Sequence, residues 1–256
     1  MLETCEISRI LSITAHPDDV DFAAAGTVAR WTEAGIEVVY CLVTDGDAGG
    51  FDEDSPREEM PAVRRAEQVA AAKCVGVHDV RFLGYPDGRV EASLDLRRDL
   101  ARVIRQVRPD RILCPSPERN YARIGVGHPD HRAVGSAALD AVYPDARNPF
   151  AFPELLERES LAAWIVREVW IAGGPDPGPR DAPYSEIAMS KESSAHGTSV
   201  AVAHTTGTTV PVSPSRRREC WSWRSERSRP TAVPPWSITQ REHWAAPQPS
   251  SSTCLP

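Results

Sequence analysis

Apolar residues follow two different spacings in the first 172 residues, and the two spacings alternate along the chain. Short runs rich in Val, Ile and Leu predict buried strands, and longer stretches with apolar residues every three or four positions predict helices. The predicted strands cover residues 7–14, 37–44, 79–83, 111–114 and 167–171. The predicted helices cover residues 22–34, 57–74, 94–107 and 132–142.

This alternation predicts an α/β fold. Strands joined by helices of this length need right-handed crossovers, which place the strands parallel in one sheet and the helices on both of its faces. We therefore expect a Rossmann-like three-layer sandwich with a largely parallel sheet. No GxGxxG segment follows the first predicted strand, so a dinucleotide site is not expected.

The composition changes beyond residue 183. Residues 1–183 hold 21 Lys and Arg against 31 Asp and Glu, whereas residues 184–256 hold 8 against 5, together with 22 Ser and Thr. We predict one folded domain over residues 1–183 and an atypical Ser/Thr/Arg/Pro-rich tail over residues 184–256 that is poorly ordered. An altered reading frame would also produce such an abrupt change. The functional alternative for the tail is a basic nucleic-acid surface around residues 216–218 and the neighbouring Trp residues.

The bulk composition disfavours several classes of partner. The net charge of −7 argues against a general surface for nucleic acid or anionic membranes. No apolar run reaches the roughly eighteen residues that a membrane span needs, and the first residues lack the basic and apolar regions of a secretory signal. Cys41, Cys74 and Cys114 lie in apolar stretches without CxxC spacing, which favours buried thiols. We therefore expect a cytoplasmic protein without nucleic-acid or membrane partners.

Two clusters of imidazole and carboxylate groups carry the candidate chemistry. Residues 15–19 (AHPDD) directly follow the first predicted strand, and residues 128–131 (HPDH) follow the fourth after a long loop. The carboxyl ends of parallel strands meet at one edge of the sheet, where ligands bind in open α/β folds. We therefore expect the two clusters to face each other across one divalent metal ion.

The residue types suit a catalytic zinc site. Such a site uses three protein ligands, commonly His and carboxylate, and leaves one position open for water. His16, Asp19 and His131 supply three ligands. Asp18 then lies beside the ion without binding it and is a candidate general base. Fe²⁺ also suits a site with two His and one Asp.

The second cluster offers two further groups. His128 could hydrogen-bond an oxyanion or protonate a leaving group. Asp130 could accept a hydrogen bond from a metal-binding histidine and so orient its ring. Either cluster alone could instead be a helix cap, because an Asp at that position accepts backbone N–H bonds. The presence of two clusters, each at a predicted carboxyl edge, favours the metal site.

With these motifs the sequence resembles the LmbE-like, PIG-L-type zinc de-N-acetylases. This family includes the deacetylases of the mycothiol and bacillithiol pathways and of the glycosylphosphatidylinositol precursor. The matching segments come in the family's order and span about residues 8–172. They are AHPDD at 15–19, GT at 26–27, TDG at 44–46, RxxE at 64–67, LGYPDG at 83–88 and HPDH at 128–131. Residues 1–183 would then form an LmbE-like deacetylase domain.

The resemblance implies a role for each matching residue in the two clusters. His16, Asp19 and His131 would bind zinc. Asp18 would be the general base and would later pass its proton to the amine. His128 would stabilise the tetrahedral oxyanion.

The resemblance also points to substrate contacts. Arg64 and Asp87 match positions that contact the sugar in the family, although Arg64 could simply be a helix-surface arginine paired with Glu67. Some members carry a tyrosine where this chain has Val126. A tyrosine contribution to the oxyanion would therefore have to come from elsewhere, and Tyr121 is the candidate.

The expected function is zinc-dependent removal of an acetyl group from an N-acetylglucosamine-type substrate by a metal-activated water. Two alternatives stay open. One is the same chemistry on a thiol-conjugate or antibiotic amide, and the other is a metal-binding member that its aberrant C-terminus impairs. The expected partner is a small amino sugar, and a homo-oligomer is left open.

Overall fold

The computed structural model describes residues 2, 6–50, 56–121, 124–172, 188–193 and 199–204. Its centre is one sheet with the strand order β3-β2-β1-β4-β5-β7-β6. The strands are β1 (Arg9–Thr14), β2 (Glu37–Thr44), β3 (Asp79–Tyr85), β4 (Arg111–Pro115), β5 (Glu168–Ala172), β6 (Ala188–Ser193) and β7 (Ser199–His204). All neighbours pair in parallel except β6, which is antiparallel to β7.

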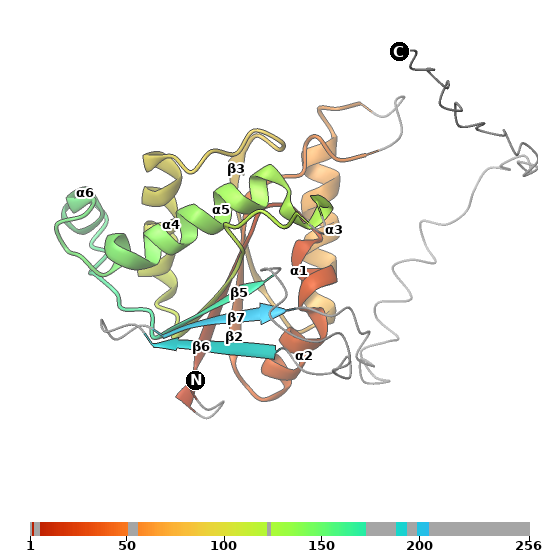
Figure 1. Ribbon diagram of the computed structural model, residues 1–256. Coiled ribbons are helices and arrows are strands. Elements are labelled where there is room, and N and C mark those ends of the chain that lie inside the picture. The colour runs from red at the N-terminus through yellow and green to blue at the C-terminus, as the bar shows by residue number, and fades with distance from the viewer. Residues whose placement is uncertain are drawn as a thin grey trace, which may run out of the picture.

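Helices cover both faces of this sheet (Figure 1). They are α1 (Asp19–Ala23), α2 (Ala25–Glu33), α3 (Met60–Cys74), α4 (Leu94–Val107), α5 (Pro129–Asp140) and α6 (Pro153–Glu157), with shorter helical segments η2 (Ile124–Gly127) and η3 (Ala141–Ala146). The predicted α/β three-layer fold is therefore confirmed.

Alternate residues of β1 supply the two apolar cores. Leu11 and Ile13 pack into the cluster that contains the apolar face of α4 and α5. Ile10 belongs to the opposite cluster, which includes Val28 of α2 and Ala72 of α3. This division follows from the strand geometry, because successive side chains point to opposite faces of the sheet. A central strand with helices on both sides therefore reads as a continuous apolar run.

Two helices differ from their predicted bounds in ways that affect the site. The single helix predicted over residues 22–34 is wrong, because Ala24, with φ −146°, separates α1 from α2. The helix predicted from residue 132 begins at Pro129, with His128 as its N-cap. Both clusters of candidate ligands therefore lie at the first turn of a helix.

A buried ion pair ties the amino ends of two neighbouring strands together. Arg111 and Glu168 begin β4 and β5 and lie opposite each other in register. Their side chains are 4% and 0% exposed, and their charged atoms are 2.7 Å apart. The guanidinium also lies 4.0 Å from the ring centre of Trp170, and it donates to the carbonyl of Leu2. Each charge thus has a partner within the protein, as buried charges require.

The cysteine prediction is partly wrong. Cys41 and Cys114 are buried free thiols, but Cys74 is disulfide-bonded. Among the helices that the structure describes, none combines the length and apolar character needed to cross a bilayer.

The predicted domain boundary at residue 183 stays a prediction. Two strands from beyond it, β6 and β7, join the sheet next to β5. The proposed basic surface at residues 216–218 lies outside the described residues.

Candidate metal centre and active site

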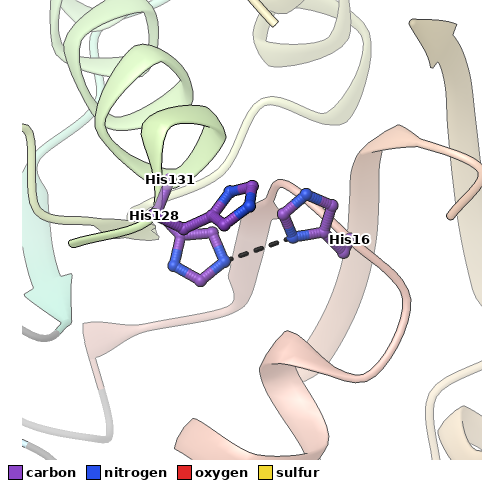
Figure 2. Close-up of side chains that lie close together, drawn as sticks. All are labelled: His16, His128 and His131. Carbon is purple, nitrogen blue, oxygen red and sulfur yellow. Dashed lines mark hydrogen bonds between the residues drawn. The ribbon is translucent and has the colours of Figure 1, made fainter. Parts of the chain in front are cut away.

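The two predicted clusters meet where the strand order reverses. β1 lies between β2 and β4. The strands β2 and β3 follow on one side of it, and β4 and β5 follow on the other side. Ligands in open α/β sheets bind at this point, beyond the carboxyl ends of the strands. His16 follows β1, and His128 and His131 lie at the start of α5 after β4. Figure 2 shows the three imidazoles facing one another. Each ring offers one nitrogen atom, and these three atoms lie within 4.8 Å of one another.

The three predicted ligands lie within 4 Å of one another. His16 Nδ1 lies 3.2 Å from His131 Nε2. Asp19 Oδ1 lies 3.1 Å from the same His131 nitrogen, and Asp19 Oδ2 lies 3.7 Å from His16 Nδ1. Ligands at about 2.0–2.2 Å from a tetrahedral zinc lie roughly 3.3–3.6 Å apart. The donor set therefore fits one four-coordinate divalent ion, with His16, Asp19 and His131 as the residues that would hold it.

The backbone at Asp18 makes the two neighbouring carboxylates diverge. Asp18 has φ 90° and ψ −22°, a left-handed conformation that non-glycine residues seldom adopt. The Asp19 carboxylate turns back and accepts bonds from the backbone N–H groups of Ala15 and His16 at 3.1 and 2.9 Å. The Asp18 carboxylate instead lies 2.7 Å from Arg64. Asp18 therefore pairs with Arg64, whereas Asp19 contacts both His16 and His131.

The other ring nitrogen of His16 contacts two carboxylates. His16 Nε2 lies 3.0 Å from Asp87 and 3.1 Å from Asp130. Asp130 is fully buried and also accepts bonds from the backbone N–H groups of Gly88 and Val90. Such a carboxylate fixes the tautomer and the orientation of a metal-binding imidazole. Asp130 is therefore placed as expected of a residue that orients His16, and Asp87, expected at the sugar, contacts the same ring.

These carboxylates dominate the electrostatics of the site. Burial opposes the charged form of His16, but the hydrogen bonds and charges of Asp19, Asp87 and Asp130 outweigh it and raise the His16 pKa to about 9. Burial likewise opposes the charged form of Asp19, yet its bonds to His131 and His16 hold the pKa well below its ordinary value. Without an ion, the raised pKa favours a proton on His16 that an ion would displace.

His128 lies beside the donor set and in a different electrostatic state. Its ring centre is 4.9 Å from that of His16 and 5.4 Å from that of His131. Burial and the neighbouring His16 lower the pKa of His128. Its Nδ1 accepts a bond from the Asp130 N–H, which leaves Nε2 to carry the proton of the neutral ring. His128 can therefore donate a hydrogen bond.

A glycine lets α5 approach the end of β4 closely enough to bring His131 into the site. A Cβ atom at Gly135, one turn after His131, would lie 2.9 Å from backbone atoms of Ser116 and Pro117. Only glycine tolerates so close a backbone approach.

Arg64 makes the ion pair of a helix-surface arginine and also reaches the turn that carries Asp18, while its contact with a sugar stays a prediction. It forms the ion pair with Glu67 that an ordinary helix-surface arginine would make, and it also contacts Asp18 and the carbonyl of Pro17. Tyr121, the candidate for an oxyanion contribution, is 87% exposed. Sequence reasoning missed Gln68, whose side-chain oxygen accepts a bond from the Asp18 N–H at 2.6 Å. The available signal was its spacing of four residues from Arg64, which places both side chains on one helix face.

The fold and the site define a Rossmann-like α/β protein with a His–Asp donor set for a divalent ion. Residues 11–142 match the family described as PIG-L, GlcNAc-PI de-N-acetylase, and the chain belongs to this family. The resemblance seen in the motifs is therefore confirmed.

Two relatives and one solved structure that are similar to this chain are named as deacetylases. A diacetylchitobiose deacetylase of Thermococcus kodakarensis is 34% identical over 137 residues, which are 54% of this chain and 50% of that protein. A 1D-myo-inositol 2-acetamido-2-deoxy-alpha-D-glucopyranoside deacetylase of Rhodococcus erythropolis is 29% identical over 68% of this chain and 71% of its own length. The structure of an N,N'-diacetylchitobiose deacetylase from Pyrococcus horikoshii, complexed with its inhibitor, matches with a TM-score of 0.61 and 25% identity, covering 87% of this chain and 72% of that one. The chain thus spans about half the length of the Thermococcus relative.

Proposed function

We propose that this protein is a metal-dependent hydrolase that removes the acetyl group from an N-acetylglucosamine-type substrate. The observation that carries the proposal is that His131 Nε2 lies close to both His16 and Asp19, while the Asp18 carboxylate pairs with Arg64 instead. Two relatives are named as deacetylases of N-acetylated amino sugars, which supports the substrate class.

The donor set favours Zn²⁺, with Fe²⁺ as the second candidate, because two imidazoles and one carboxylate suit both ions. When bound, such an ion supplies Lewis acidity, which stabilises negative charge on oxygen and makes a nearby water more acidic. His16, Asp19 and His131 would hold it. Asp130 and Asp87 would keep the His16 ring in the orientation that directs Nδ1 inward.

Asp18 would act as the general base. Its carboxylate is 45% exposed, against 18% for Asp19, so it is open to water and substrate. Asp18 would take a proton from the attacking water as the oxygen adds to the amide carbon. The same proton would pass to the departing nitrogen when the C–N bond breaks, so that acetate and a free amine are released.

His128 would meet the negative charge that develops on the amide oxygen. Its neutral ring can donate from Nε2, and hydrogen-bond donors aimed at a developing oxyanion are a large source of catalysis. Arg64 and Asp87 remain our candidates for sugar contacts. Arg64 also contacts Asp18, and Asp87 also contacts His16. The cytoplasmic location, the homo-oligomer and the lack of nucleic-acid and membrane partners stay predictions.

The test compares Asp18→Asn with Asp95→Asn in zinc-loaded protein. Asp95 is a suitable control because it is an exposed acid on α4 that pairs with Arg98. Release of free amine is measured on N-acetylglucosamine, N,N'-diacetylchitobiose and inositol-linked N-acetylglucosamine. We expect D18N to keep its ion and lose about 10²–10⁴-fold in kcat, the usual contribution of a general base, while D95N behaves as wild type. Full activity in D18N, or an ion-loaded wild type that hydrolyses no acetamido sugar, would contradict the proposal.

A further inference from the structure

We propose that Gln68 of α3 is a positioning residue that holds the peptide unit before Asp18 and so sets the direction of the catalytic carboxylate. This inference rests on the proposed role of Asp18 as the base. It concerns a residue outside the motifs that define the family resemblance.

The peptide unit between Pro17 and Asp18 is held at both ends by α3. Its carbonyl, on Pro17, accepts a bond from Arg64 at 3.0 Å. Its N–H, on Asp18, donates to the side-chain oxygen of Gln68 at 2.6 Å. Rotation of this unit would break both bonds. The left-handed conformation of Asp18 is therefore fixed from outside the turn, as a strained backbone at a functional site requires.

The chemistry of a side-chain amide suits this position. Gln68 is 2% exposed, so its polar atoms need partners within the protein. Its oxygen faces the Asp18 N–H, which can only donate, and its nitrogen donates to the Asp21 carboxylate at 3.4 Å. An apolar residue of the same size would fill the space and leave the Asp18 N–H unpaired.

Gln68 separates positioning from chemistry in a way that Arg64 does not. Arg64 contacts the Asp18 carboxylate directly, so replacing it changes both the geometry and the charge around the base. Gln68 contacts Asp18 through its backbone N–H, and its other hydrogen bond goes to Asp21. Its replacement therefore alters the direction of the carboxylate without touching it or the donor atoms of His16 and His131.

The test uses Gln68→Met, with Gln106→Met on α4 as the matched control. Gln106 accepts a bond from Arg81 away from the site. We expect Q68M to lower kcat about tenfold, within the range for a small misplacement of a catalytic group, with KM and zinc stoichiometry unchanged and Q106M as wild type. A Q68M enzyme with wild-type kcat, or equal losses in both variants, would overturn the proposal.

A double variant tests whether the hydrogen bonds or the size of the side chain matter. Combining Q68E with D21N keeps an acceptor for the Asp18 N–H and reverses the second bond, with the same total charge. We expect it to recover most of the kcat lost in Q68M. Failure to recover any activity in a folded, zinc-loaded double variant would count against the hydrogen-bond account.

Two structural measurements judge the inference even if the proposed function fails. In wild-type protein, the Asp18 amide should exchange slowly with solvent, and crystals of Q68M should show Asp18 outside the left-handed conformation. Fast exchange, or an unchanged Asp18 backbone in Q68M, overturns the inference alone. A zinc-loaded wild type that hydrolyses no acetamido sugar overturns the proposed function alone. The exchange rate is measured on wild-type protein, so it tests the inference even where a variant fails to fold.

Discussion

The two edges of the sheet both bury charged groups, but they balance them differently. At the amino edge, Arg111 and Glu168 pair one cation with one anion. At the carboxyl edge, Asp19, Asp87 and Asp130 contact imidazoles, and within the described part of the chain no Lys or Arg forms an ion pair with any of them. Both groups of charged residues follow from the same parallel topology, which gathers the starts of the strands at one edge of the sheet and their ends at the other.

This difference separates stability from function. Buried charges persist only when they are paired or when they bind a metal. The pair at the amino edge is already neutral, whereas the carboxyl edge gathers three carboxylates around two imidazoles. We therefore expect changes at the carboxyl edge to affect ion binding and turnover, and changes at the amino edge to affect folding. The predictions below run from the largest expected effect on turnover to the smallest.

The largest effect should come from His131→Ala. Removing one of three ligands leaves a donor pair that holds a divalent ion poorly, so we expect zinc binding and turnover to fall to background while the fold persists. Zinc content and amine release provide the measurement. His78→Ala, an exposed histidine at the edge of β3, is the control. Retention of stoichiometric zinc and activity in H131A would show that the ion is held elsewhere.

A smaller effect is expected for Asp130→Asn. The change preserves size but removes the charge that orients His16, and partners of this kind are worth about 10–100-fold in metal affinity or activity. Competition with a zinc chelator measures the affinity. Asp140→Asn, a half-exposed acid on the same helix, should change nothing. Equal zinc affinity in both variants would contradict the role given to Asp130.

The smallest effect on turnover, and the largest on stability, should come from Glu168→Gln. It leaves the Arg111 charge buried without its partner, which costs about 3–5 kcal/mol of unfolding free energy. Chemical denaturation measures this cost. Glu159→Gln breaks a partly exposed pair with Arg102 and should cost at most about 1 kcal/mol. A similar cost for both variants, or reduced zinc affinity in E168Q, would remove the contrast between the two edges.

Local signals predicted much of the fold. The helix over residues 94–107 has the predicted bounds, because Ser93 caps its start and Pro109 follows its end. The break at Ala24 could not be predicted, since alanine favours an unbroken helix. Strand β7 is a short run in a Ser- and Thr-rich segment, and its place beside β5 depends on pairing across the fold.

The contacts of the site likewise divide into those that local sequence patterns predict and those that they do not. His16, Asp19 and His131 could be proposed because they stand in compact motifs after predicted strands, and the parallel topology implies that such motifs meet. The contact between Gln68 and Asp18 joins residues 50 positions apart. It depends on how α3 packs beside the turn, which no local pattern encodes. The contact of Asp87 with His16 was missed for the same reason.

The central claim is that one divalent ion is held by His16, Asp19 and His131, with Asp18 unbound. Diffraction from zinc-loaded crystals, recorded at the zinc absorption edge, tests it most directly. We predict one strong anomalous peak per chain at about 2.0–2.2 Å from donor atoms of all three residues, with the Asp18 carboxylate outside coordinating distance. A peak bound through Asp18 in place of Asp19, or one located away from His16 and His131, would contradict the account.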